Sequence, residues 1–214
     1  MTPRLAFISL EPDAALSSLV SGYKRRVAAL AGDQLYLTDP PHTTLYLAAF
    51  NDLEAVLAAL KRASAKIEAI DVALEGWFVF YNDALTGNHT LVCHWSEASR
   101  RAAQAIQGAV LKELAPLRHS PATEARFAAS WDRLSLDQQR SVTAFGFPYT
   151  GEAWHPHLTI ASIRPQDWDA VYEVLRRDPP QFRGRAVGLK LYELIDGRPA
   201  AIGSEPLHLQ AKAA

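Results

Sequence analysis

The chain contains the same short motif twice, a histidine followed two positions later by a threonine. The first copy occupies residues 42–44 (HTT), and the second occupies residues 157–159 (HLT), 115 residues further along. Each copy opens an apolar run that is typical of a β-strand. Because strand side chains alternate between two faces, the histidine and threonine of each copy should point to the same side. A proton-transfer group beside a hydroxyl, presented twice, suits one phosphate held between two strands.

Each motif strand is followed by a predicted helix. After the first motif, the sequence NDLE resembles a capping box with Asn51 as the cap, and it predicts a helix over residues 52–66. After the second motif, Pro165 suits the first turn of a helix that should run to about residue 177. Both helices carry apolar residues at helical spacing, so each should pack one face against a core.

A further strand is predicted after each helix, within residues 67–80 in the first half and 185–195 in the second. The repeated order of strand, helix and strand predicts an internal duplication. We expect one domain over residues 1–214, made of two pseudo-symmetric lobes whose histidines face a shared cleft. The alternative is an α+β chain in which this order arose by chance.

Two other helices are predicted, over residues 13–31 and from Ser96 to about Leu117. The segment 118–154 is less regular and should hold one short helix, starting near Ser135. A long connection immediately before a candidate site strand is often functional, and a variable surface loop is the alternative.

Composition narrows the possible partners. The formal net charge is −1, so no basic field would hold a long nucleic acid nonspecifically. The single cysteine, Cys93, excludes an internal disulfide and a cysteine-based zinc site, and it agrees with a cytoplasmic location. The apolar run at the N-terminus is too short for a signal peptide, and no segment reaches membrane-spanning length. We therefore expect a cytoplasmic monomer with a small substrate or the end of a short RNA as its partner.

The segments PHTTLYL and HPHLTIA, together with the closing LYELIDGRPAAI, resemble the 2H phosphoesterase superfamily. Within it, the chain is most similar to the bacterial branch of 2′-5′ RNA ligases and 2′,3′-cyclic phosphodiesterases. This resemblance implies a bilobal α+β fold with two antiparallel sheets lining a central cleft. It also implies phosphodiester chemistry on 2′,3′-cyclic or 2′-5′-linked nucleotides, possible reversal as a ligase, and no metal or cofactor.

The resemblance places the family's catalytic positions at His42, Thr44, His157 and Thr159. The second motif of this branch often ends in arginine, as H-x-T-L-x-R. This chain has Ser162 at that position, and Arg164 stands two residues further on. The departure bears on the substrate and subfamily more than on the chemistry.

The residues themselves suit that chemistry. Hydrolysis of a cyclic phosphodiester needs one proton taken from water and one given to the departing ribose oxygen. Histidine titrates near pH 6.5 and can serve in either role, and the residue types do not fix which ring is the acid. The threonine hydroxyls can donate to the non-bridging oxygens as charge develops.

Four further residues are candidates for substrate binding. Tyr46 follows the first motif on the predicted face of His42, and Tyr149 and Trp154 precede the second motif. These rings could stack a base, and packing in the core is the alternative. Arg164 could bind a second phosphate.

Two other functions stay open. A nucleotide-binding module could keep the cleft without turnover. A metal-dependent hydrolase could use His155 and His157, since histidines two apart on a strand can bind zinc, although no H-E-x-x-H motif or carboxylate cluster accompanies them.

Overall fold

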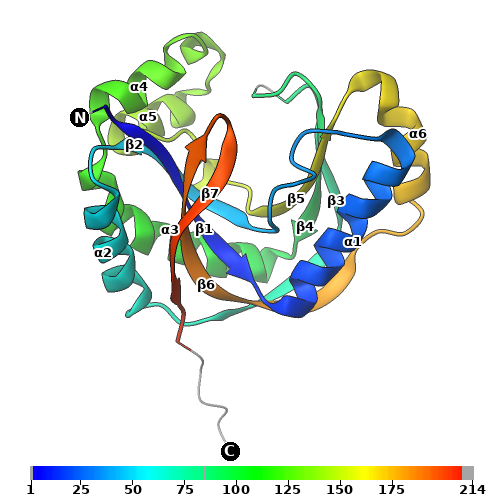
Figure 1. Cartoon of the computed structure of the whole chain (residues 1–214), viewed down its shortest axis with the longest axis horizontal. Coiled ribbons are helices and arrows are strands. Elements are labelled where there is room, and N and C mark those ends of the chain that lie inside the picture. The colour runs from blue at the N-terminus through cyan, green and yellow to red at the C-terminus, as the bar shows by residue number, and fades with distance from the viewer. Residues whose placement is uncertain (1, 84, 209–214) are drawn as a thin grey trace, which may run out of the picture.

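The computed structural model describes residues 2–83 and 85–208 (Figure 1). Within these residues, seven strands form one antiparallel sheet in the order β2-β1-β6-β3-β4-β5, and β7 pairs with β6. The strands are β1 (Arg4–Pro12), β2 (Thr43–Phe50), β3 (Ile70–Phe80), β4 (His89–Trp95), β5 (His157–Ile163), β6 (Gln181–Ile195) and β7 (Arg198–Pro206). The helices are α1 (Ala14–Ala31), α2 (Leu53–Ser64), α3 (Glu97–Leu114), α4 (Ser120–Ala128), α5 (Leu136–Phe145) and α6 (Pro165–Leu175), with short 3-10 helices η1 (Ala115–Leu117), η2 (Trp131–Arg133) and η3 (Gly151–Ala153).

The expected α+β class is confirmed, whereas the expectation of two separate sheets is wrong for the described residues. The reason is the length of β6, which spans 15 residues. Its residues 181–186 pair with β3, and its residues 186–193 pair with β1. Because one strand serves both halves of the molecule, the backbone hydrogen bonds run through a single sheet (Figure 1).

Helix boundaries follow local capping. Asp13 caps α1 with its side chain, and Gly32 ends that helix at a positive φ of 64°. The cap of α2 is Asp52, whose carboxylate accepts two backbone N–H groups. The prediction of Asn51 as the cap is therefore wrong by one residue. Helix α6 begins at Pro165, as predicted.

The connection between α3 and β5 holds more structure than the sequence indicated. Helix α5 begins after Ser135, at the predicted place, and Ser135 and Gln138 form a capping box there. Helix α4 was not predicted. It has nine residues, and only Thr123 and Phe127 on it are buried, so it carries almost no apolar periodicity.

The helices divide between the two halves of the sheet. Helices α1 and α6 contact each other, and α1 also packs on β5, while α2 and α3 pack together near β2 (Figure 1). The apolar face of α3, formed by Ala103, Ile106, Val110 and Leu114, is buried. No helix in the part of the chain that the structure describes has the length and apolar character needed to cross a bilayer.

Candidate active site

The two motif strands share an irregularity that their sequences do not announce. In β2 the pairing with β1 passes from Thr44 to Tyr46 and leaves Leu45 without a partner in the ladder. In β5 the pairing with β4 passes from Thr159 to Ala161 and leaves Ile160 without a partner in the ladder. Each strand therefore has a β-bulge at the residue directly after its motif threonine. These matched bulges support the internal duplication that we propose for the chain.

The bulge in β2 corrects the prediction for Tyr46. An extra residue reverses the alternation of faces, so Tyr46 points away from the side that presents His42 and Thr44. Its side chain is fully buried, and its hydroxyl donates to the carbonyl oxygen of Phe145 at 2.6 Å. Tyr46 therefore belongs to the core and does not face a substrate.

Both motif histidines are held in the same way. The Nδ1 atom of His42 donates to the carbonyl oxygen of Pro40 at 2.7 Å, and that of His157 donates to the carbonyl oxygen of His155 at 2.7 Å. Since a carbonyl oxygen can only accept, the proton of each neutral ring lies on Nδ1. The Nε2 atom is then left with a lone pair that can take a proton from a substrate or water.

The fold brings the two motifs into direct contact. The hydroxyl of Thr43 donates to the carbonyl oxygen of His157 at 2.7 Å, which joins the first motif to the second. The indole N–H of Trp154 donates to the carbonyl oxygen of Thr44 at 3.2 Å. Strands that are far apart in the order of the sheet are thus linked at their motif ends.

The contact also shows what Trp154 does. Its side chain is only 4% exposed, so it packs in the core and is not available to stack a substrate base. The two motif histidines and the threonines Thr44 and Thr159, in contrast, are all partly exposed. Trp154 therefore lies beside the first motif, but its burial contradicts the predicted role in stacking a base.

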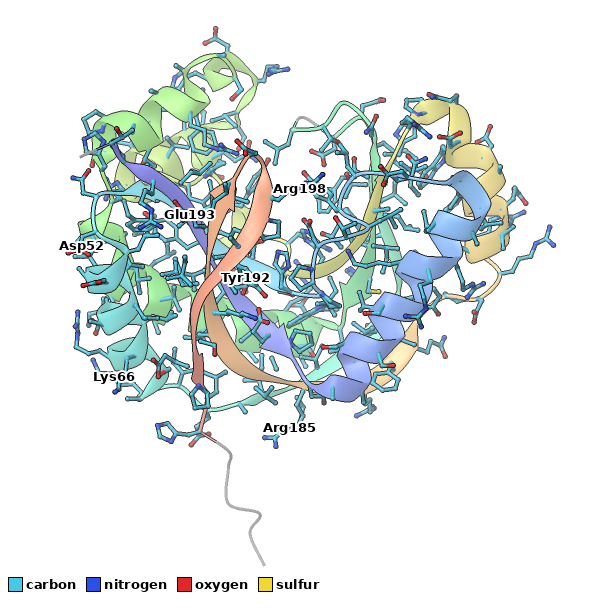
Figure 2. All side chains as sticks on the ribbon, in the orientation of Figure 1. Asp52, Lys66, Arg185, Tyr192, Glu193 and Arg198 are labelled. Atoms are coloured by element: carbon cyan, nitrogen blue, oxygen red, sulfur yellow. The ribbon has the colours of Figure 1, made fainter. Side chains whose placement is uncertain are left out.

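Aromatic rings pack against both histidines. Phe7 stacks on His42 at a centroid distance of 5.0 Å, and Tyr192 of β6, labelled in Figure 2, lies 5.9 Å from it. Phe80 of β3 lies 5.1 Å from His157. These rings limit how each imidazole can turn, and the sequence offered no signal for them beyond the alternation of their strands.

The surroundings keep both rings uncharged. Burial lowers the pKa of His42 to about 4, and the positive charges of Lys24 and a protonated His157 act in the same direction, while the bond to Pro40 opposes them. Burial also lowers the pKa of His157, opposed by its bond to the carbonyl of His155 and by the carboxylate of Asp83. Both histidines are therefore neutral at pH 7 in the free protein, and they lie close enough for their charges to interact.

Lys24 is a residue that sequence analysis missed. Its side chain is buried, and its ammonium group donates to the carbonyl oxygen of Tyr36. Burial lowers the pKa of Lys24 to about 8, so it is still mainly charged at pH 7. A signal was present in the sequence, because Lys24 lies four residues after Val20, on the buried side of α1.

Arg164 is paired within its own helix. It follows β5 as the cap of α6, five residues after Thr159. It is exposed, and its Nε pairs with Asp167 at 2.8 Å. Ser162 is fully buried, and its hydroxyl donates to Thr86 at 2.8 Å. Neither residue supplies a positive charge at the motifs, so the prediction for Arg164 is not supported.

Tyr149 has an intermediate position. It is partly buried, and its ring packs edge-on against Phe147 at 5.5 Å. Burial and the nearby carboxylate of Asp83 raise the pKa of its phenol, so the hydroxyl stays protonated at neutral pH. A substrate contact by Tyr149 stays a prediction.

The residues proposed for a metal site are engaged otherwise. The Nε2 atom of His155 lies 3.1 Å from Nδ1 of His94 in a hydrogen bond, and its ring stacks on Phe78. Among residues 2–83 and 85–208, no group of three or more histidine, cysteine or acidic side chains is arranged to hold a metal ion.

A fold that joins two strands at paired HxT motifs has the arrangement of a 2H phosphoesterase. A family model described as the 2′-5′ RNA ligase superfamily matches residues 12–198. The chain therefore belongs to the 2′-5′ RNA ligase superfamily, and this membership supports a phosphodiesterase-type function.

Solved structures share the fold at low identity. LigT of E. coli in the apo form is 14% identical, with a TM-score of 0.53 and coverage of 97% of this chain and 99% of LigT. TT0787 of Thermus thermophilus is 15% identical, with a TM-score of 0.57 and coverage of 97% and 100%. Usb1 of Kluyveromyces marxianus is 14% identical, with a TM-score of 0.52 and coverage of 95% and 98%. LigT has also been solved with phosphate and with 3′-AMP. No curated protein matches the chain.

The reassignment of Tyr46 can be tested by Tyr46→Phe. The variant leaves the buried carbonyl of Phe145 without its donor, so the free energy of unfolding should fall by about 1–2 kcal/mol. Because the ring stays in the core, kcat/KM for a phosphodiester substrate should be unchanged. Urea unfolding and steady-state kinetics measure the two quantities, and a large loss of activity at unchanged stability would show instead that Tyr46 touches the substrate.

Proposed function

We propose that the protein is a metal-independent phosphodiesterase that acts on 2′,3′-cyclic phosphates or 2′-5′-linked nucleotides and RNA ends. One observation carries the proposal: the hydroxyl of Thr43 links the first motif directly to His157. Each motif histidine is held by the same kind of Nδ1 bond and has a threonine two residues away, and a charge on His157 acts on His42. The complexes of the similarly folded LigT with phosphate and 3′-AMP support a small nucleotide as the ligand.

The reaction needs two proton transfers at one phosphorus. One neutral histidine takes a proton from water through Nε2 as the water oxygen attacks phosphorus. The other, protonated, donates to the ribose oxygen as its bond to phosphorus breaks. The hydroxyls of Thr44 and Thr159 donate to the non-bridging oxygens and stabilise their charge. The product is a ribose phosphomonoester with one free hydroxyl.

The charges near the two rings differ, and this difference indicates which ring is the base and which is the acid. The buried cation of Lys24 disfavours a positive charge on His42, whereas the carboxylate of Asp83 favours one on His157. We therefore assign His42 as the base and His157 as the acid in hydrolysis. In the reverse direction, ligation, the two roles exchange.

An assay with nucleoside 2′,3′-cyclic phosphates and with 2′-5′-linked dinucleotides tests the function. Hydrolysis should continue in EDTA, because the proposal uses no metal ion. Binding without turnover would identify a nucleotide-binding module, and loss of activity in EDTA that is restored by a divalent metal would identify a metal-dependent hydrolase. Either result contradicts the proposal.

The assignment of acid and base predicts proton uptake on anion binding. Both rings are neutral in the free protein, and a bound anion raises a histidine pKa by favouring the charged form. Binding of sulfate, which has no titrating proton near neutral pH, should therefore take up a proton, chiefly on His157. Calorimetry in two buffers of different ionisation enthalpy measures this uptake.

Two variants make that measurement specific. Uptake should persist in His42→Ala and disappear in His157→Ala. The opposite pattern would reverse the assigned roles, and sulfate binding without any proton uptake in the wild-type protein would contradict the electrostatic argument.

A further inference from the structure

A second group of rings lies beside His157, and the proposed proton transfers do not use it. It consists of Phe78 of β3, His94 of β4 and His155, which precedes β5; we call these three residues the ring platform. In the ladder His94 pairs with His157, and Phe78 lies opposite Val92, which in turn pairs with Thr159. The platform is therefore on the same face of the sheet as the second motif.

The two histidines of the platform form one nearly flat plate. Nδ1 of His94 and Nε2 of His155 are 3.1 Å apart, the ring centroids are 5.0 Å apart and the planes differ by 19°. This geometry places the two rings edge to edge, tied by the hydrogen bond. The phenyl ring of Phe78 packs over the plate, 4.4 Å from His155 and 6.0 Å from His94.

Phe78 has a solvent-exposed surface for which the proposed proton transfers give no role. Its side chain is 38% exposed, although a large apolar ring usually gains by burial. One face lies on the histidine plate, and Phe80 contacts the ring in a T-shaped arrangement at a centroid distance of 4.9 Å. The ring is therefore held by His155, His94 and Phe80, and the rest of its surface is open to solvent.

The platform carries no charge at neutral pH. Burial, together with nearby positive charge, lowers the pKa of His155 to about 4. Burial and Arg100 also lower the pKa of His94, opposed by Glu75. An uncharged aromatic surface is suited to a planar, weakly polar group and not to a phosphate.

We propose that Phe78, braced by His94 and His155, is the stacking site for the nucleobase of the substrate. This inference rests on the proposed function, because it assumes a phosphate held at His42 and His157. Phe80 connects the two places, with its centroid 4.9 Å from Phe78 and 5.1 Å from His157. A base one ribose away from the phosphorus therefore reaches the platform.

The platform is also coupled to the catalytic ring. The carbonyl oxygen of His155 accepts a hydrogen bond from Nδ1 of His157, while the ring of His155 packs against Phe78. A base stacked on Phe78 would therefore rest on the residue that orients His157. The substrate class that follows is a nucleoside phosphodiester, with selection for the presence of a base and not for a second phosphate.

Kinetics with and without a base test the inference. Wild-type protein, Phe78→Ala and Phe78→Tyr are compared on adenosine 2′,3′-cyclic phosphate and on 1-O-methylribose 2,3-cyclic phosphate, which lacks the base. For the nucleotide, Phe78→Ala should lower kcat/KM by about 5- to 150-fold, the range of one stacked base, and Phe78→Tyr should restore it. For the baseless substrate the three proteins should be equal. Trp131 on η2 is 37% exposed, close to the 38% of Phe78. Trp131→Ala is therefore the control, and it should leave kcat/KM unchanged for both substrates.

A binding measurement keeps this inference separate from the proposed function. The fluorescence of 2-aminopurine riboside 3′-monophosphate should be quenched on binding to the wild-type protein, and Phe78→Ala should weaken that binding by a similar factor. Equal losses on both substrates, no loss at all, or binding without quenching would overturn the platform. Absence of turnover by the wild-type protein on every phosphodiester would refute the proposed function instead, and the fluorescence result would still decide the platform.

Discussion

Replacing His42 or His157 with alanine is expected to lower kcat for a nucleoside 2′,3′-cyclic phosphate by about 10²–10⁴-fold in each case. Each imidazole is fixed through Nδ1 and offers Nε2, so its removal takes away one positioned proton-transfer group. The double variant should be little worse than either single variant, because a base without its acid already fails to complete the reaction.

His208→Ala is the matched control. His208 is an exposed histidine on the C-terminal side of β7, and its loss should leave kcat unchanged. Circular dichroism and thermal unfolding establish that each variant is folded. Activity near that of the wild-type protein in His42→Ala or His157→Ala, with the fold intact, would refute paired acid–base catalysis.

Replacing Thr44 or Thr159 with valine is expected to lower kcat by about 10²-fold, the order found when one donor to a developing oxyanion is removed. Valine keeps the shape and the strand preference of threonine, so the change only exchanges the hydroxyl for a methyl group. KM should change less than kcat, because the hydrogen bonds strengthen as charge develops on the phosphoryl oxygens.

Serine at the same positions separates the hydroxyl from the methyl group. Thr159→Ser should retain most of the activity that Thr159→Val loses. Thr143→Val, on an exposed position of α5, is the control and should not alter kcat. If valine raises KM and leaves kcat unchanged, the threonines bind the ground state and do not stabilise the transition state.

The elements around the site were largely predictable. Apolar residues at helical spacing predicted α1 and α3, Ser135 predicted the start of α5, and Pro165 predicted the start of α6. These signals arise from hydrogen bonds and contacts between residues a few positions apart, so they are present in a short stretch of sequence. Helix α4 was missed because its nine residues are too few and too polar to form a pattern.

The candidate site was predicted less evenly. The two motif histidines and threonines were proposed as catalytic from their spacing, and all four are partly exposed in the structure. Tyr46 and Trp154 were assigned to the substrate on the assumption of regular alternation and of nearness in sequence. The bulge at Leu45 turns Tyr46 to the other face of the strand, and Trp154 is buried in the core. Phe78 was not among the predicted substrate-binding residues, and the structure leaves it partly open to solvent.

The sequence by itself determined the class of the fold, the family, and the pair of motifs with the residue types that acid–base chemistry requires. Only the tertiary structure decided that one long strand unites the sheet, that Thr43 joins the first motif to His157, and that Phe78 rests on a pair of hydrogen-bonded histidines. The reason is physical. Strand and helix preferences are set by immediate neighbours along the chain, whereas a bulge, a buried lysine or a contact between strands depends on partners that only folding brings near.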